Sequence, residues 1–229
     1  MFSLSPQDMQ AIRLSVEVAA AATLLTAPFG FAAAYLLVFA KIPARAVLEG
    51  IINLPLVLPP VVVGYLLLLL FGKNGGLGPL LAVFDIRIIF TPAGAVLASA
   101  VVGFPLLVRA IRIGMEAIDA RYLQAARTLG AGWQDCLFTI ILPLSGRALL
   151  AGMTLMFARS LGEFGATVIL AGNIPGVTQT IPLAIYEYTS TPGGDRMALS
   201  LCLVSVVLSF LVLLVSEASA RSLQRRAAR

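Results

Sequence analysis

Long apolar runs constrain the fold of this chain more than any other feature. Residues 18–40, between Glu17 and Lys41, hold no charge, and a second uncharged run extends from Gly50 to Gly72. At about 1.5 Å per helical residue, either run crosses the ~30 Å hydrocarbon core of a bilayer. The chain is 59% hydrophobic and only 12% charged. Because backbone groups find no water in lipid, such runs must be helical, and the sequence predicts an all-α membrane protein.

The apolar pattern predicts a bundle of about five transmembrane helices in a single transmembrane domain, residues 1–229. The expected spans cover about residues 14–40, 48–72, 88–110, 145–171 and 197–218. Glycine and proline turns predict outer loops over 73–87 and 172–196. The one long polar interruption, 116–143, lies between the third and fourth expected spans, and it is the first place to look for function.

Basic residues are distributed unevenly between the two sets of loops. One side carries ten: Lys41, Arg45, Arg109, Arg112, Arg121, Arg127, Arg221, Arg225, Arg226 and Arg229. The other side carries four: Arg13, Lys73, Arg87 and Arg196. The positive-inside rule then predicts a cytoplasmic C-terminus, a cytoplasmic 116–143 loop and an outside N-terminus. The first ten residues, MFSLSPQDMQ, hold no Lys or Arg and so lack the positive n-region of a signal peptide, and a cleaved signal peptide is not expected.

The 116–143 loop has the local features of a helical elbow. Asp119 can cap a helix start, and Gly130 can end that helix in a left-handed turn. The residues between them that share one apolar face are Tyr122, Ala125, Ala126 and Leu129. Such a face suits docking into a groove of a partner protein, but it also suits an interfacial helix lying on lipid. Periodicity alone leaves both interpretations open.

The spacing within this loop resembles a known motif. Gln124-Ala125-Ala126 is followed after three residues by Gly130, and after nine more by Ile140, Leu142 and Pro143. This resembles the E-A-A-x3-G-x9-I-x-L-P loop of ABC importer permeases, which lies in a groove of the ATPase subunit. The resemblance implies that the ATPase-coupling residues are Gln124, Ala125, Ala126, Leu129 and Gly130. Because Gln124 stands where that family has Glu, no charge-based role carries over.

Further stretches resemble the molybdate permease family of bacterial ABC importers, with sulfate and tungstate permeases as related alternatives. These stretches are 53–69, 98–119, 124–132, 157–167 and 173–186, and the likeness runs from about residue 10 to 220. The resemblance implies the type I importer permease fold and multi-pass placement in the bacterial inner membrane. It also implies a homodimer, two cytoplasmic ATPase subunits that bind ATP-Mg, and an extracytoplasmic oxyanion-binding protein. No cofactor or metal is expected on this chain, and no nucleic acid partner.

Prolines interrupt the second apolar run. Pro59 and Pro60 lie in it, together with Asn53. A proline-broken helix is tolerated in lipid mainly where it packs in protein or lines a wet cavity. One interpretation is therefore a packing kink, and the other is that Asn53, Pro59 and Pro60 border the translocation path.

The fourth expected span carries charges. Arg159 and Glu163 are four residues apart and would share a helix face, with Ser160 beside them. Charges at this depth are expensive unless they are paired or hydrated, so the residues are functional candidates. Either the pair pins helices together, or Arg159, Ser160 and Glu163 line the path or its gate.

Enzymatic patterns are missing from the sequence. Gly72-Lys73 is followed by Asn74, so there is no phosphate-binding loop for ATP. The chain has no histidine, and its two cysteines are not spaced for a metal site or a disulfide framework. A secondary transporter would need mid-membrane carboxylates, for which Glu163 alone qualifies. A channel needs no docking elbow, and a structural scaffold would tolerate scrambling of 124–130.

Overall fold

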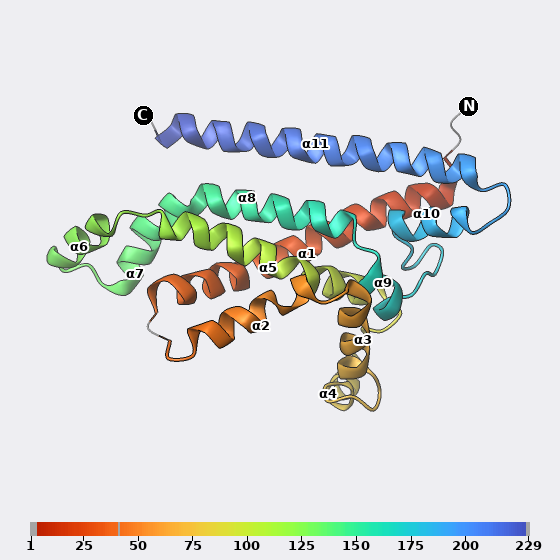
Figure 1. Cartoon of the computed structure of the whole chain (residues 1–229), viewed down its shortest axis with the longest axis horizontal. Helices are drawn as coiled ribbons and strands as arrows, with labels where there is room; N and C mark the ends of the chain where they lie inside the picture. The colour runs from red at the N-terminus through yellow and green to blue at the C-terminus, as the bar shows by residue number, and fades with distance from the viewer. Residues whose placement is uncertain (1–3, 41, 228–229) are drawn as a thin grey trace.

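The computed structural model describes residues 4–40 and 42–227, and this part of the chain is helical without strands. Long helices run side by side along the longest axis of the molecule (Figure 1). They are α1 (Pro6–Phe39), α5 (Pro92–Glu116), α8 (Leu142–Leu161) and α11 (Asp195–Ala227). Within the described residues, four helical stretches are long and apolar enough to cross a membrane, or five if one bent pair is a single span. The expected all-α membrane fold is confirmed.

The centre of the bundle is built from α1, α5 and α8. Its fully buried side chains include Leu107 and Ile111 from α5 and Met156 from α8. Small residues bring the helix backbones together: a Cβ on Gly30 would lie 2.6 Å from Leu107 Cδ2, and one on Gly114 would lie 2.1 Å from Ala148 Cβ. Close packing of small residues holds helices together in lipid, where apolar burial supplies little driving force.

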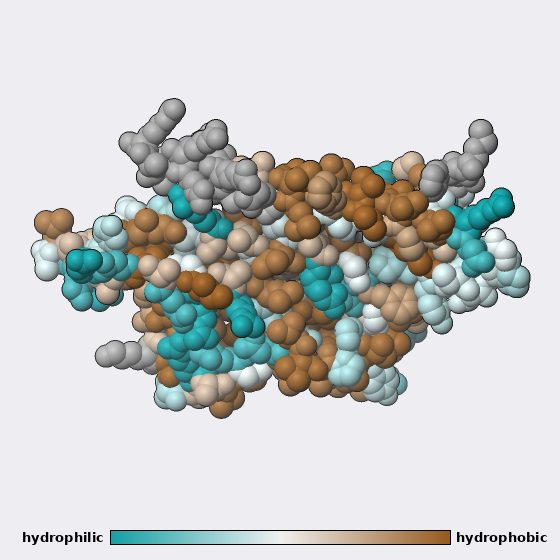
Figure 2. All heavy atoms as spheres, turned by 45° about the horizontal axis from the view of Figure 1, so that its top comes forward, coloured by the Kyte–Doolittle hydropathy of each residue, from teal (hydrophilic) through white to brown (hydrophobic). Residues whose placement is uncertain are grey.

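Apolar side chains remain exposed on the outside of the bundle. Hydrophobic residues cover much of the middle of the face shown in Figure 2, and hydrophilic residues gather nearer both ends. On α11 the exposed residues include Val206, Val207 and Phe210. An apolar band of this kind matches a lipid environment.

The second span is bent. Helices α2 (Arg45–Val57) and α3 (Pro60–Phe71) meet at an angle of 112°. The break falls at Pro59 and Pro60, which lack the backbone N–H needed to continue a helix. The segment expected over 48–72 is therefore two helices, and α3 points away from the long axis (Figure 1).

The fourth span is also broken, contrary to the expected helix over 145–171. Helix α8 ends at Leu161, and the short helix α9 (Gly165–Leu170) begins after a three-residue break. Glu163 lies in this break, and its Oε1 accepts a hydrogen bond from the Ala166 N–H at 2.8 Å. The carboxylate thus satisfies a backbone donor in the first turn of α9, which favours a new helix start over continuation of α8.

Three connections complete the fold. Helix α4 (Gly78–Val83) lies in the 73–87 loop. Helices α6 (Ala120–Thr128) and α7 (Trp133–Cys136), with a π-helical turn at Leu137–Ile141, form the 116–143 connection. Helix α10 (Ile181–Thr189) lies in the 172–196 segment and packs on α1, where the Tyr188 hydroxyl donates to Asp8 Oδ1 at 2.7 Å. The α6–α7 end of the bundle is called the elbow end below.

Candidate functional site: the elbow and the two helix breaks

The turn between α6 and α7 is set by local hydrogen bonds. The Ala131 N–H donates to the Ala126 carbonyl, and the Gly130 N–H donates to the Arg127 carbonyl, both at 3.0 Å. This pair of bonds is the Schellman C-cap, which requires a left-handed residue after the helix. Gly130 supplies it with φ +86°. Gly130 therefore ends α6 in a left-handed turn, as the sequence predicts.

The start of α6 is set by Asp119. Its side chain accepts from the Arg121 N–H at 2.9 Å and also pairs with the Arg121 guanidinium at 2.6 Å. The hydrogen bond from the Arg121 side chain, followed by the one from its backbone, holds the pKa of Asp119 below its usual value. The cap therefore stays ionised at neutral pH, where a negative charge favours a helix N-terminus.

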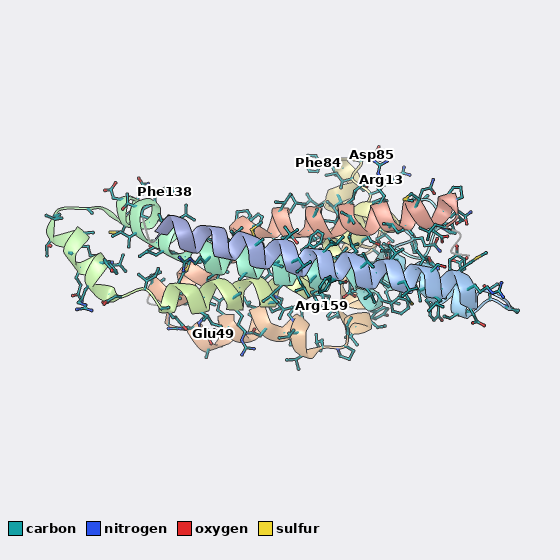
Figure 3. The ribbon with its side chains drawn as sticks, turned by 90° about the horizontal axis from the view of Figure 1, so that it is seen from above. Arg13, Glu49, Phe84, Asp85, Phe138 and Arg159 are labelled. Carbon is teal, nitrogen blue, oxygen red and sulfur yellow. The ribbon has the colours of Figure 1, made fainter. Side chains whose placement is uncertain are left out.

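The elbow exposes large apolar side chains outside the bundle. Leu129 is 88% exposed, and Tyr122, Trp133 and Phe138 are also exposed. Figure 3 places Phe138 at the elbow end, beyond most of the bundle. No residue of α6 is buried, so the candidate coupling residues Gln124, Ala125 and Ala126 are not fully covered by this chain, and neither is Leu129, the C-cap of α6. Apolar side chains exposed on a projecting segment indicate an interaction surface.

One neighbour on α6 was not anticipated. Leu123 is partly buried and packs against the central hydrophobic core. It therefore anchors α6 to the bundle, while the face that carries Leu129 stays free. Its position one residue before Gln124 gives no sign of this in the sequence.

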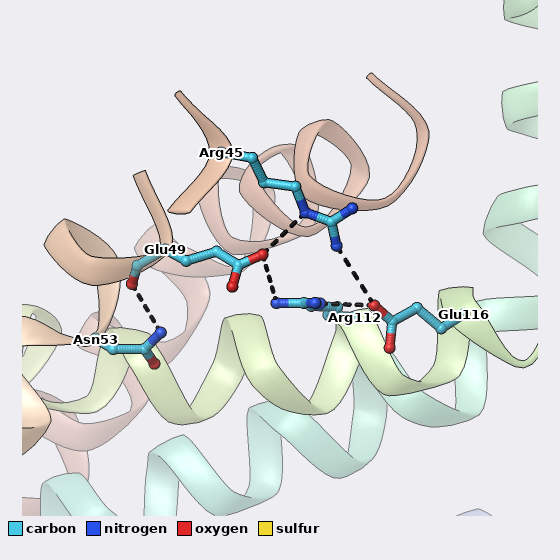
Figure 4. Close-up of polar contacts among 5 residues, drawn as sticks. All are labelled: Arg45, Glu49, Asn53, Arg112 and Glu116. Carbon is cyan, nitrogen blue, oxygen red and sulfur yellow. Dashed lines mark hydrogen bonds and ion pairs between the residues drawn. The ribbon is translucent and has the colours of Figure 1, made fainter. Parts of the chain in front are cut away.

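A cluster of charges links α2 to α5 at the elbow end (Figure 4). Glu49 accepts from Arg45 at 2.9 Å and pairs with Arg112 at 3.0 Å. Glu116 pairs with Arg112 at 2.7 Å and with Arg45 at 3.8 Å. The i,i+4 pairs are visible in the sequence, but the two cross-helix contacts are not. Alternating charges in one network tie the two helices together more firmly than isolated surface pairs.

Arg159 and Glu163 form an ion pair at the break between α8 and α9. Arg159 Nη1 lies 2.7 Å from Glu163 Oε2, and the side chains are 30% and 2% exposed. Glu163 is thus a buried carboxylate held by one guanidinium and one backbone N–H. Figure 3 places Arg159 near the middle of the length of the bundle. Ser160 beside it is buried, and its hydroxyl has no hydrogen-bond partner among the described residues.

The remaining candidates fall in two places. Pro60, at the α2/α3 break, approaches α9: a Cβ on Gly165 would lie 3.0 Å from Pro60 Cβ. The two helix breaks, one with Pro59 and Pro60 and one with Glu163, are therefore neighbours. Asn53 lies elsewhere, beside the charged cluster, where its Nδ2 donates to the Glu49 carbonyl at 2.8 Å.

Close backbone contact holds the two breaks together, which gives a first prediction. A Cβ on Gly64 of α3 would lie 2.7 Å from the carbonyl oxygen of Ala166 and 2.8 Å from its Cα. Gly64→Ala should push α3 away from α9 and destabilise the protein by about 1–3 kcal/mol, the usual cost of overpacking. The measurement is the thermal midpoint in detergent.

The matched control is Gly50→Ala, because a Cβ there meets nothing within 4 Å. Alanine favours a helix over glycine, so this variant should be neutral or slightly stabilising. Equal midpoints for the two variants would contradict the close α3–α9 contact.

The architecture is that of the transmembrane subunit of an ABC importer. An importer of the acidic polysaccharide alginate superposes on this chain with a TM-score of 0.76 at 14% identity, over 96% of this chain and 80% of that one. A methionine ABC transporter superposes with a TM-score of 0.68 at 18% identity, over 96% and 99%. At such low identity these likenesses establish the fold alone.

The family follows from sequence. Residues 26–229 match the model for the binding-protein-dependent transport system inner membrane component, and the chain belongs to this family. A molybdenum transport system permease of Escherichia coli K12 is 50% identical over 99% of both chains. That of Haemophilus influenzae is 48% identical over 96% of both. A sulfate transport system permease of Synechococcus elongatus is 40% identical over 81% of this chain and 65% of its own length. The family resemblance drawn from the sequence motifs is confirmed.

Proposed function

We propose that this chain is the permease subunit of an ATP-driven importer that moves molybdate into the cytoplasm. The observation that carries the proposal is 50% identity with a molybdenum permease over 99% of both chains. Sulfate is the second candidate, supported by a sulfate permease at 40% identity over a smaller share of each chain. Tungstate has the same charge and tetrahedral shape as molybdate and belongs to the same test.

The proposed assembly places two copies of this chain in the inner membrane. Two cytoplasmic ATPase subunits bind ATP-Mg and contact the elbow, and an extracytoplasmic protein delivers the oxyanion. The uneven loop charges support an orientation with the N-terminus outside. The exposed apolar elbow supports docking into a groove of the ATPase over an interfacial helix, because its exposed face lies on a projecting segment.

Coupling in this assembly depends on the continuity between the elbow and the fourth span. Helix α7 runs through the π-helical turn into α8, and Trp133–Leu161 is apolar enough to be one span. Closure of the ATPase dimer would therefore shift α8 along with α7 and carry the motion to the α8/α9 break. ATP binding can shift the permease from one conformation to the other only if the ATPase contacts the two conformations differently. The proposed coupling residues are Gln124, Ala125, Ala126, Leu129 and Gly130.

The path or gate is proposed at the two neighbouring breaks. Pro59 and Pro60 interrupt one helix and Glu163 lies in the other interruption. An arginine near the path favours an entering anion, but a tight site would slow release. Arg159 is already paired with Glu163, so its contact with cargo is weak and transient.

ATP hydrolysis by the reconstituted complex tests the function. The permease and its cognate ATPase are placed in liposomes, and binding protein is added empty or loaded with molybdate, tungstate or sulfate. Stimulation by the molybdate-loaded form, together with molybdate uptake, is the expected result. Stimulation by the sulfate-loaded form alone would move the chain to the sulfate branch. If no loaded form stimulated an assembled complex, the cargo assignment would be wrong.

A further inference from the structure

A cavity with both polar and apolar lining lies between α1, α2 and α5 at the elbow end. Its volume is about 330 Å³, with room for several water molecules. Asn53 from α2 and the two α5 residues Arg109 and Arg112 supply its polar lining. Arg112 also belongs to the charged cluster of Figure 4, so the cavity lies directly against that cluster.

The charges around this cavity do not balance. In the cluster, Arg45 and Arg112 are matched by Glu49 and Glu116. Arg109 forms no ion pair or hydrogen bond with any residue that the structure describes. The cavity therefore carries one uncompensated positive charge. Arg109 and Arg112 are three residues apart on a helix, so they lie on the same face of α5.

The donors that line the cavity suit one kind of ligand. A guanidinium presents a planar fork of N–H donors that matches two oxygens of a phosphate-like group. No described residue of this chain occupies any of the Arg109 donors. The Asn53 amide nitrogen donates one hydrogen to the Glu49 carbonyl, which leaves its second hydrogen for a ligand. Arg109 is an exposed residue, so its guanidinium is accessible to a ligand.

We propose that this cavity binds a tetrahedral oxyanion, with Arg109 as the charged anchor and Arg112 and Asn53 as further donors. Two sources supply that chemistry. One is the translocated oxyanion as it leaves at the elbow end, a role that rests on the proposed function. The other is the phosphate of a membrane lipid headgroup. A single uncompensated charge in an open cavity gives weak binding, which suits an anion that must leave.

Binding to the assembled complex tests the proposal. The permease with its ATPase subunits, without binding protein, is placed in nanodiscs of phosphatidylcholine or of phosphatidylglycerol. Binding of radiolabelled molybdate and the lipid phosphorus that remains after detergent purification are measured. The variants are Arg109→Gln, the charge-retaining Arg109→Lys, and the matched control Arg13→Gln. Arg109 has no partner among the described residues of this chain, and Arg13 loses only an exposed pair with Glu17, so these variants should fold.

If the ligand is the released oxyanion, we expect saturable molybdate binding by the wild type and Arg13→Gln in both lipids. Loss of one charged hydrogen-bonding partner should weaken it about tenfold or more in Arg109→Gln, with partial rescue in Arg109→Lys. If the ligand is a lipid headgroup, we expect no molybdate binding in phosphatidylglycerol. We also expect the wild type to retain more lipid phosphorus than Arg109→Gln. Equal molybdate binding and equal phosphorus in the wild type and Arg109→Gln would overturn the proposal. Stimulation of ATP hydrolysis by loaded binding protein tests the proposed function separately. The proposed function and the proposed oxyanion site can therefore fail independently of each other.

Discussion

Replacing Gly130 with valine is expected to reduce oxyanion uptake strongly while the protein still inserts and assembles with its ATPase. Gly130 has φ +86°, a conformation that costs a β-branched residue about 1–3 kcal/mol. A Cβ at this position meets nothing within 4 Å, so the effect comes from the backbone and not from a clash. The Schellman turn should open, and the exposed face of α6 should lose its angle to α7.

Separately from this strain, the coupling free energy between two sites is typically about 1–3 kcal/mol, a roughly 5–150-fold change in affinity. Uptake should fall within that range, while ATP hydrolysis continues without a response to loaded binding protein. Both are measured in the same proteoliposomes. Assembly is checked by copurification of the ATPase.

Gly193→Val is the matched control. Gly193 has φ +83° and open space around a Cβ, so valine suffers the same strain there, but the turn lies between α10 and α11, away from the elbow. This variant should transport normally per assembled complex. Normal uptake in Gly130→Val, or equal losses in both variants, would count against a coupling role for the elbow.

Replacing Arg159 with alanine is expected to destabilise the complex strongly. Removal of one partner leaves the Glu163 carboxylate, 2% exposed, without its counter-ion. Removing one partner of a buried ion pair costs about 3–5 kcal/mol of stability. The loss of stability in Arg159→Ala should be smaller, because Arg159 is 30% exposed and solvent screens the pair. The readouts are the thermal midpoint in detergent and uptake per assembled complex.

Two further variants serve as controls for Arg159→Ala. Arg13→Ala removes a similar i,i+4 pair whose side chains are 79% and 54% exposed, and it should change the midpoint little. Arg159→Ala with Glu163→Gln removes the orphaned charge and should recover part of the stability. A lower midpoint with normal uptake would mean that the pair pins helices, whereas altered uptake at normal stability would place it at the gate. If Arg159→Ala changed neither quantity, both interpretations would fail.

The elbow could be anticipated because its geometry is local. Asp119 caps α6 through a residue two positions away, and Gly130 closes the turn through bonds within five residues. Short-range motifs of this kind depend on residue type at fixed spacing, which a sequence displays directly. The direction of the free face could not be fixed in the same way, since it depends on Leu123 packing against the core.

The fourth span shows where local patterns are insufficient. Apolar periodicity favours one helix through 145–171, yet α8 ends at Leu161. The Glu163 carboxylate binds the Ala166 N–H, and α9 then packs against α3 at Gly64. The sequence contains both features, but the gain from that long-range contact is what outweighs the helical bonds lost at the break.

The sequence by itself determined that the chain is an all-α membrane protein of the importer permease family with a helical elbow, because hydrophobic runs, capping residues and motif spacing act over a few helical turns. Tertiary structure alone decided that the two broken helices are neighbours and that Arg45, Glu49, Arg112 and Glu116 form one cluster beside an uncompensated Arg109. Those contacts join residues far apart in the chain, and their formation depends on how close two backbones can approach.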